Sequence, residues 1–312
     1  MAALRFSIVI PVYNGGVSFQ RCLASIQESL RSPDEIIVVS DGDTDGSWQV
    51  AEAFGATVIR LPSPGGPARA RNVGAKAAHG DILFFVDADV TLHPDTLGLV
   101  EQRFARFPDL TGLIGSYDDA PGASNFLSQY KNLFHHYNHQ ISPEVISTFW
   151  GACGAVRRSA FHAVGGFDER YRKPCIEDIE LGYRLTRAGY ALRLYKDIQA
   201  EIFYRALPWT ELLLRDKNFN AELNLSARNR FSVICVFLLM ACLAITHWID
   251  WVGLGAITLI LALLFINLNV YRFFYRKRGL LFTLKVIPWH WLYFLYGGAA
   301  FAYGSAKHHL TR

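Results

Sequence analysis

Two carboxylates separated by one residue follow a short apolar segment in the first third of the chain. Residues 81–86 read Asp-Ile-Leu-Phe-Phe-Val, the pattern of a buried parallel strand, and Asp87-Ala88-Asp89 comes directly after them. Open α/β sheets bind ligands at the carboxyl ends of their strands. Two aspartates there can hold a divalent cation, and the cation can hold a diphosphate. An isolated Asp-x-Asp is more often an acidic turn, so this interpretation depends on the other motifs of the chain.

Three further motifs fall where strands are expected to end or where the following helix begins. They are Pro11-Val12-Tyr13-Asn14, Ser40-Asp41-Gly42-Asp43-Thr44-Asp45-Gly46, and the segment from Pro64 to Asn72, which reads Pro-Gly-Gly-Pro-Ala-Arg-Ala-Arg-Asn. Two more lie far downstream, Gly165-Gly166-Phe167-Asp168-Glu169 and Glu177-Asp178-Ile179-Glu180-Leu181-Gly182. Each motif alone has low specificity, whereas their order and spacing together are specific.

The elements that must position these motifs alternate between strand and helix. The expected strands are residues 5–12, 36–39, 57–61 and 81–86, and the expected helices are residues 19–30, 47–54 and 68–78. This alternation predicts a right-handed parallel α/β unit of the nucleotide-binding type. The Asp87 motif and the three motifs of the first half then lie at one carboxyl edge of one sheet. Residues 90–229 are less regular, with an aromatic-rich stretch and a helix after Glu177-Asp178.

The set of motifs resembles glycosyltransferase family 2 over residues 5–195. The resemblance implies the A-type (GT-A) nucleotide-diphospho-sugar transferase fold, a Rossmann-like α/β domain. It also implies that Asp41 meets the nucleotide base in a pocket lined by Pro11 and Tyr13. Simple packing against the core is the alternative interpretation for Tyr13.

The resemblance further implies a site for a diphosphate and a metal ion. Asp89, with or without Asp87, would bind Mg²⁺ or Mn²⁺, and the ion would bridge the phosphates of the donor. Asp87 and Ala88 would lie on the ribose side of the donor. Arg71, together with the start of the helix near Ala68, would add positive potential.

Sugar transfer also needs a base that takes the proton of the acceptor hydroxyl. Asp178 matches the Glu-Asp motif of the family and is the expected catalytic base, and Glu177 is expected to orient the acceptor or the loop. The family implies attack on the face opposite the leaving diphosphate, and so inversion at the anomeric carbon. Trp150 lies in a segment that resembles the acceptor side, where it could stack on a sugar or belong to the core.

Histidine and cysteine residues give no clear metal site. His135 and His139 have the i, i+4 spacing of a metal-binding pair on a helix, but no carboxylate partner is evident nearby, so a polar helix face is the preferred interpretation. The five cysteines contain no Cys-x-x-Cys pair. They fit reduced thiols better than a zinc site or a disulfide framework.

Two features depart from the pattern of the family. Many relatives carry a histidine after the Glu-Asp helix that can complete the metal site, but residues 195–204 contain none, and Glu201 is a candidate substitute. The missing histidine keeps one alternative open, a degenerate, non-catalytic membrane partner in envelope assembly. The other alternative is a processive polysaccharide synthase, and the absence of the Gln-x-x-Arg-Trp motif of such synthases argues against it.

The composition changes near residue 231. Hydrophobic residues make up 51% and aromatic residues 14% of the 312 residues, and the excess lies in three runs without formal charge, 231–249, 251–271 and 286–306. Each run is long enough to cross a hydrocarbon core of about 30 Å. The sequence therefore predicts two or three transmembrane helices. The third run has Pro288 and His290 near its start and could instead lie partly in the interface.

These patterns predict three regions: a catalytic domain over 1–204, an amphipathic membrane-interface segment over 205–230, and a transmembrane region over 231–312. Lys and Arg flank the first two runs on one side only, which predicts a multi-pass protein of the inner membrane with a cytoplasmic catalytic domain. No signal peptide is expected, because the chain enters a strand at once. The net formal charge is +4, and the basic residues are concentrated near the membrane runs, which favours anionic lipid over nucleic acid as a partner.

The sequence thus predicts an inverting, metal-dependent glycosyltransferase with a nucleotide-diphospho-sugar donor. The expected acceptor is lipid-linked or hydrophobic, such as a polyprenyl phosphate, because it could reach Asp178 from the bilayer. A UDP-sugar is the donor that the family uses most often. Two or three spans are too few for a translocating channel, which favours transfer of one sugar per acceptor.

Overall fold

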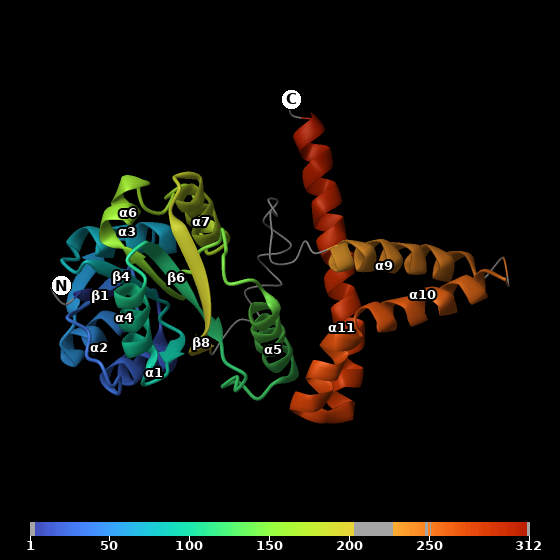
Figure 1. Ribbon diagram of the computed structural model, residues 1–312, viewed down its shortest axis with the longest axis horizontal. Coiled ribbons are helices and arrows are strands. Elements are labelled where there is room, and N and C mark those ends of the chain that lie inside the picture. The colour runs from blue at the N-terminus through green and yellow to red at the C-terminus, as the bar shows by residue number, and fades with distance from the viewer. Residues whose placement is uncertain (1–3, 203–226, 247–248, 250, 311–312) are drawn as a thin grey trace. The chain divides into compact units, whose positions relative to one another are not determined.

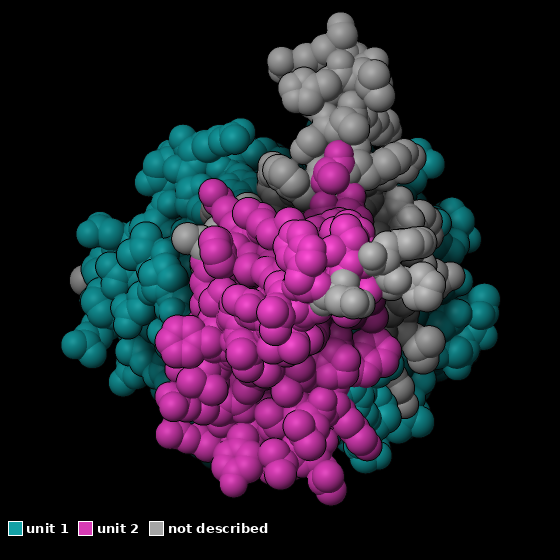
Figure 2. All heavy atoms as spheres, turned by 90° about the vertical axis from the view of Figure 1, so that its right-hand side faces the viewer, with its two compact units in different colours: residues 1–208 teal, residues 209–312 magenta. Residues whose placement is uncertain are grey.

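The computed structural model describes residues 4–202, 227–246, 249 and 251–310. The chain divides into two compact units, Met1–Pro208 (unit 1) and Trp209–Arg312 (unit 2), which are coloured separately in Figure 2. Most of the predicted membrane-interface segment, residues 205–226, lies outside the described residues. Each unit is described by itself.

Unit 1 is built on a mixed sheet whose described strands have the order β3-β2-β1-β4-β7-β6-β8-β5 (Figure 1). The strands are β1 (Phe6–Val12), β2 (Glu35–Asp41), β3 (Thr57–Leu61), β4 (Ile82–Val86), β5 (Val90–Leu92), β6 (Leu110–Tyr117), β7 (Cys153–Arg157) and β8 (Ala191–Ile202). Strands β1 to β4 are parallel, as their sequences predicted. β7 runs antiparallel to both β4 and β6, and β5 runs antiparallel to β8, so the complete sheet is mixed.

Helices cover both faces of this sheet (Figure 1). They are α1 (Gly16–Gln27), α2 (Ser47–Phe54), α3 (Pro67–Ala77), α4 (Thr96–Arg106), α5 (Phe126–Ile141), α6 (Arg158–Ala163) and α7 (Glu177–Arg187). All five residues of β4 are buried, as in a strand covered on both faces, which explains its unbroken apolar sequence. The strands β5 to β8 and the helices α4 to α6 fall in the region where the sequence showed no regular pattern.

Aromatic packing fixes the second half of unit 1 onto β4. The ring of Phe85 on β4 is fully buried, and its centroid lies 6.2 Å from that of Phe149, 5.3 Å from that of Phe161 and 5.1 Å from that of Phe167. Aromatic pairs at such separations stabilise a core beyond the area they bury. One strand residue therefore holds three segments that come more than 60 residues later in the chain.

Unit 2 consists, in its described part, of the helices α9 (Ala227–Ile245), α10 (Val252–Ile266) and α11 (Leu268–Leu310). The amide nitrogen of Asn267, between α10 and α11, donates to the hydroxyl of Ser232 on α9 at 3.1 Å. Within α11, the indole of Trp291 donates to the hydroxyl of Tyr271 at 3.0 Å, across the interruption at Gly279. Gly279 interrupts α11 with a φ of 78°, a conformation that glycine adopts readily.

One described helix, over Arg228–Ile245, is long and apolar enough to cross a membrane. A second candidate arises only if α10 and residues 268–299 of α11, which meet at a bend of 64°, are taken as one span. The described residues therefore contain one or two candidate spans, and the separate third span expected over 286–306 is not among them. That run lies within α11 and is rich in Trp, Tyr and His, whose rings carry polar atoms and lower its hydropathy.

Candidate active site

Three of the predicted motifs emerge at one edge of the sheet, because β1, β2 and β4 are parallel neighbours and their carboxyl ends coincide. Pro11 and Tyr13 lie at the end of β1, Asp41 ends β2, and Asp87 follows β4. The side chain of Tyr13 is 56% exposed, so it does not pack in the core. A ring at the surface of a ligand-binding edge suits the role predicted for Tyr13, contact with the base.

Asp41 is 5% exposed and holds the loop that precedes α3. Its carboxylate accepts hydrogen bonds from the backbone N–H of Gly65 at 2.9 Å and of Gly66 at 2.8 Å. Gly66 has a φ of 95° and a ψ of 165°, a conformation that is essentially restricted to glycine. The structure therefore gives Asp41 a contact that the sequence did not predict, the fixation of the Gly65-Gly66 loop.

Arg71, on α3, lies between two of the other predicted residues. One terminal nitrogen contacts Oδ1 of Asp87 at 2.5 Å, and the other contacts Oε1 of Glu177 at 2.9 Å. The side chain is 4% exposed. Burial disfavours the charged form, but the charges of Asp87, Glu177 and Asp178 more than offset this, so the pKa of Arg71 lies above its ordinary value. Arg71 is therefore a permanent cation among three carboxylates.

The Glu-Asp motif forms the first turn of α7, where the helix dipole favours negative charge. Glu177 is buried, and its second oxygen accepts from the backbone N–H of Cys175 at 2.9 Å. Asp178 accepts from the backbone N–H of Gly151 at 3.1 Å through Oδ2. Glu177 thus fixes the loop before α7, and Asp178 contacts the turn before β7.

The Asp87-Ala88-Asp89 stretch is partly buried and follows the last residue of β4. Its two carboxylates fit a divalent cation by the chemistry of their oxygens, since Mg²⁺ is usually held by one or two carboxylates with substrate phosphates completing the shell. In the described part of the chain, no group of three or more His, Cys, Asp or Glu side chains could hold a metal ion. Two protein carboxylates with a diphosphate are therefore the set that these residues support.

Glu201, the candidate substitute for the missing histidine, lies on β8 opposite Thr91 of β5. Burial raises its pKa above the ordinary value, the charge of Asp118 raises it further, and Arg21 and His93 oppose the shift. The charged neighbours that shift the pKa of Glu201 thus include neither Asp87 nor Asp89. The structure gives no three-residue metal set that contains Glu201 among its described residues.

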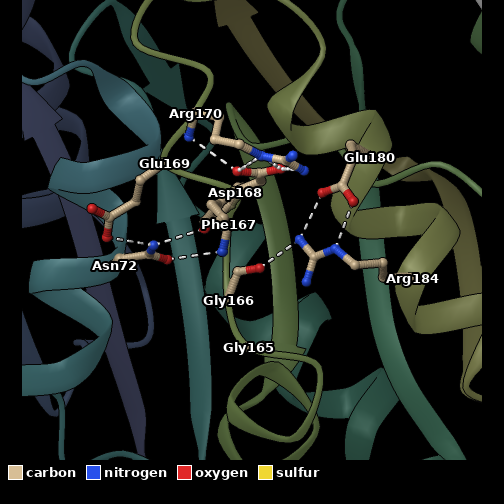
Figure 3. A pocket seen from close by; sticks show the side chains of 9 residues that line it. All are labelled: Asn72, Gly165, Gly166, Phe167, Asp168, Glu169, Arg170, Glu180 and Arg184. Atoms are coloured by element: carbon tan, nitrogen blue, oxygen red, sulfur yellow. Dashed lines mark hydrogen bonds and ion pairs between the residues drawn. The ribbon is translucent and has the colours of Figure 1, made fainter.

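The Gly165-Gly166-Phe167 loop is clamped from two helices. Asn72 of α3 donates to the carbonyl oxygen of Phe167 and accepts from its N–H, both at 2.8 Å. Arg184 of α7 donates to the carbonyl oxygens of Val164 and Gly166, both at 2.6 Å. Figure 3 shows Asn72 and Arg184 on opposite sides of the loop, around a hollow of about 450 Å³. This motif therefore positions α7 relative to α3.

Trp150 is 7% exposed, and its ring stacks on that of Tyr117 with centroids 4.6 Å apart. His139 of α5 meets the edges of both rings, at 5.3 Å from Tyr117 and 5.4 Å from Trp150. The ring of His135 stacks on that of Tyr117, with their centroids 5.0 Å apart. Of the two interpretations left open for Trp150, core packing is the one that this geometry supports.

Two family models match the chain. The model described as glycosyl transferase family 2 matches residues 7–165, half of the chain, and includes Asp41, Arg71 and Asp89. This chain belongs to glycosyl transferase family 2. The model described as the N-terminal domain of galactosyltransferase matches residues 132–206 and includes Glu177 and Asp178. Both parts of the candidate site therefore lie in segments that resemble glycosyltransferases.

Curated relatives of this family 2 chain carry glycosyltransferase names. Glycosyltransferase GlyG of Streptococcus pneumoniae serotype 4 is 31% identical over 116 residues, which are 36% of this chain and 38% of GlyG. The N-acetylglucosaminyl-diphospho-decaprenol L-rhamnosyltransferase of Mycobacterium tuberculosis is 28% identical over 218 residues, 59% of this chain and 71% of that protein. The chain thus spans much less than two thirds of the length of GlyG.

A solved relative supports the fold assignment. The mannosyltransferase PcManGT from Pyrobaculum calidifontis, solved with GDP-Man and Mn²⁺, matches with a TM-score of 0.56 and 17% identity over 98% of this chain and 87% of that chain. At this identity the likeness shows the fold, which is the α/β GT-A type with a mixed sheet.

Three residues of the site were missed by the sequence analysis as positioning groups: Asn72, Gly151 and Phe167. Asn72 and Phe167 belong to motifs that the sequence analysis named, and Gly151 follows Trp150, which was singled out. Their positioning roles arise from contacts with segments far away in the chain, so membership of a motif, or adjacency to a named residue, was the available signal.

Proposed function

We propose that this chain is an inverting glycosyltransferase that moves a sugar from a nucleotide-diphospho-sugar to a lipid-linked or hydrophobic acceptor at a membrane. The observation that carries the proposal is one continuous cluster. Arg71 joins Asp87, at the carboxyl end of β4, to Glu177, at the start of α7, and Asp178 follows Glu177 directly. A donor-binding edge and a candidate base are thereby brought together from positions about 90 residues apart in the sequence.

The donor half of the proposal uses the edge formed by β1, β2 and β4. Tyr13 and Pro11 line the base, with Asp41 beside them, and Asp87 and Ala88 lie on the ribose side. Asp89, with or without Asp87, would hold Mg²⁺ or Mn²⁺, which would offset the charge of the diphosphate as it leaves. A UDP-sugar is the first donor to test, and a GDP-sugar is the second, because PcManGT was solved with GDP-Man.

The chemical step assigned to this chain is a proton transfer. Asp178 takes the proton of the acceptor hydroxyl, the hydroxyl oxygen forms a bond to the anomeric carbon, and the bond from that carbon to the diphosphate oxygen breaks. The nucleoside diphosphate leaves with the electron pair of the broken bond. Attack from the face opposite the leaving group inverts the anomeric configuration.

The hydrogen bond from Gly151 fits this role for Asp178. A backbone N–H donor at 3.1 Å stabilises the ionised carboxylate, which is the form that can accept a proton, and fixes the direction of one oxygen. The position at the first turn of α7 acts in the same sense, since the helix dipole favours a negative charge there.

A membrane acceptor is supported by the surface of unit 2. Large apolar side chains of α9 and α10 are exposed, among them Leu238 (50%), Leu254 (70%), Leu261 (61%) and Phe265 (78%). Exposed apolar surface of this extent marks contact with lipid or with a partner. The decaprenol-linked acceptor in the name of the Mycobacterium tuberculosis relative points in the same direction.

The proposed organisation is a catalytic domain over 1–204, an interface segment over 205–230 and a membrane region over 231–312. The second apolar run, residues 251–271, is followed by Arg272, Arg276, Lys277 and Arg278, and the turn between the first two apolar runs has no Lys or Arg. By the positive-inside rule, the catalytic domain would then face the cytoplasm.

The experiment is nucleotide release by the purified full chain in detergent. The protein is incubated with Mn²⁺ or Mg²⁺, a panel of UDP-, GDP- and dTDP-sugars, and membrane lipid extract, and each reaction is repeated with Asp178→Asn. Release from one donor that requires lipid extract and is lost in the variant supports the proposal and identifies the donor.

Two results would contradict it. Release that is equal in Asp178→Asn would show that this carboxylate is not the base. Absence of release together with absence of nucleotide binding would leave a non-catalytic membrane partner as the better explanation of this fold.

A further inference from the structure

The side chain of Arg71 bonds to carboxylates of both parts of the candidate site, Asp87 and Glu177. We propose that Arg71 is a positioning residue that couples donor binding to the first turn of α7, which carries Glu177 and Asp178 and is called the catalytic turn below. Its guanidinium ties Asp87 to Glu177 and so sets the place of Asp178. The inference rests on the proposed function for its catalytic consequence. The sequence had assigned Arg71 a different role, positive potential for the diphosphate.

The burial of Arg71 separates these two roles. Its side chain is 4% exposed, and that of Glu177 is 5% exposed, whereas the side chain of Asp87 is 23% exposed. Each terminal nitrogen already contacts a carboxylate. Because its guanidinium is fixed in this way, Arg71 stays buried, and Asp87 is the side chain that reaches the solvent-accessible edge where a donor would bind.

Two neighbouring residues, Phe167 and Gly151, restrict the position of the Arg71 guanidinium. Its central carbon lies 5.3 Å from the centroid of the Phe167 ring, within the range of a cation–π contact. On Gly151, a Cβ atom would lie only 3.0 Å from the central carbon of Arg71. The absence of a side chain at Gly151 is therefore what lets Arg71 pack against this turn.

The turn that contains Gly151 also holds the proposed base, Asp178. The N–H of Gly151 donates to Asp178, and Asp178 is the neighbour of Glu177. Arg71 thus acts on the first turn of α7 in two ways, directly through its ion pair with Glu177 and indirectly through its packing on Gly151, which holds Asp178. Movement of Asp87 on donor binding would be passed to both, because a buried arginine with two ion pairs has few alternative positions.

The test is a double-mutant cycle with Arg71→Met, Glu177→Gln and the double variant, each made in the full chain. Sugar transfer and nucleotide affinity are measured for all four proteins, and thermal unfolding is measured in parallel. We expect Arg71→Met to lower kcat about 100-fold and to weaken nucleotide binding less than about 10-fold. The double variant should be no worse than Arg71→Met, because residues that act through one contact are not additive.

Two more variants separate positioning from simple charge. Arg71→Lys keeps the charge but loses the fork that reaches two carboxylates, so it should recover only part of the loss in kcat. Gly151→Ala leaves all charges in place and displaces the guanidinium, and it should lower kcat about 10-fold at nearly unchanged nucleotide affinity. Lys76→Met is the matched control, since Lys76 is an exposed cation on the same helix, α3, and should have no effect.

Two results would overturn the inference. The first is a loss of nucleotide affinity as large as the loss of kcat in Arg71→Met, with full recovery in Arg71→Lys, which would mean direct contact with the diphosphate. The second is strict additivity of Arg71→Met and Glu177→Gln. Should the unmodified chain transfer no sugar at all, the proposed function fails, but additivity or its absence in thermal unfolding still tests the coupling of Arg71 to Glu177.

Discussion

The two halves of unit 1 contribute to the candidate site in different ways. In the proposed donor half, residues 6–92, Tyr13, Asp41 and Asp87 stand at the ends of strands, and their positions follow from the parallel pairing of β1, β2 and β4. Arg71 of the same half stands on α3. In the acceptor half, residues 110–202, the candidate base stands at the start of a helix, and its position depends on contacts from Arg71 and Gly151.

The two halves should therefore respond differently to substitution. Strand pairing distributes the position of Asp41 or Asp87 over many backbone hydrogen bonds, so single substitutions nearby change it little. The place of Asp178 rests on a few side-chain and loop contacts, so single substitutions there have large effects.

The largest effect is expected from Asp178→Asn in the acceptor half. The amide keeps the size of the side chain but cannot take a proton, so kcat should fall about 10² to 10⁴-fold while the affinity for the nucleotide stays the same. Sugar transfer and calorimetric nucleotide binding measure the two quantities. Asp109→Asn, at an exposed carboxylate before β6, is the control and should retain full activity. If Asp178→Asn lost nucleotide affinity as well as kcat, the proposed contrast between the two halves would be wrong.

Asp89→Ala tests the donor half. Removal of a proposed metal ligand should weaken metal-dependent nucleotide binding at least about 100-fold, because even outer-shell changes at metal sites cost about 10- to 100-fold. The measurement is a nucleotide titration with and without Mn²⁺, and addition of a chelator to the unmodified protein should reproduce the loss. Glu52→Gln, on the exposed face of α2, is the control. Binding that is independent of metal in both proteins would count against the metal site.

Gly66→Ala tests the position at which the backbones of the two halves approach each other, at Gly66 and Arg172. A Cβ atom there would lie 2.2 Å from the carbonyl oxygen of Arg172, and the φ of 95° is unfavourable for alanine. We expect a loss of about 3 kcal/mol in the free energy of unfolding, measured by denaturant titration. Gly98→Ala, within α4 and with no atom near the added Cβ, should instead stabilise by about 0.5 to 1 kcal/mol. Equal effects at both glycines would contradict this reading of the loop.

The smallest effect concerns pH and a pair away from the catalytic turn. The ring of His93 lies 3.1 Å from Asp118, and this hydrogen bond raises the pKa of His93 above its ordinary value, although burial opposes the shift. The folded chain therefore holds the proton more tightly than the unfolded chain. The resulting stability is complete below the unfolded pKa of about 6.5 and is lost as the pH rises through the folded pKa.

The check is thermal unfolding of the unmodified chain and of His93→Gln at about pH 5.5 and pH 8.5. The variant should be less stable at the lower pH, by less than about 1 kcal/mol because His93 is 43% exposed, and equally stable at the higher pH. A larger difference at the higher pH would reverse the sign of the linkage and refute the assignment.

How much the sequence could predict follows the same division between the halves. The strands β1 to β4 were predicted, because buried parallel strands are unbroken apolar runs and turn residues follow each of them. The strands β5 to β8 were not, because no comparable motifs follow them in the sequence. Of the two or three membrane spans predicted, the described residues contain one or two candidates, since residue counts take no account of the bend between α10 and α11 or of the lower hydropathy of residues 286–306.

The amino-acid sequence alone was enough to assign the family and to find the residue types that the chemistry needs. Carboxylates after a buried strand and a Glu-Asp pair at the start of a helix are local patterns. The match over residues 7–165 confirms the family, while the Glu-Asp pair lies beyond it, in the segment that resembles galactosyltransferase. Which of these residues touch follows only from the fold. Arg71 lies between Asp87 and Glu177, and Asp41 binds the Gly65-Gly66 loop, because a buried charge or carboxylate must find its partners wherever the packed chain brings them.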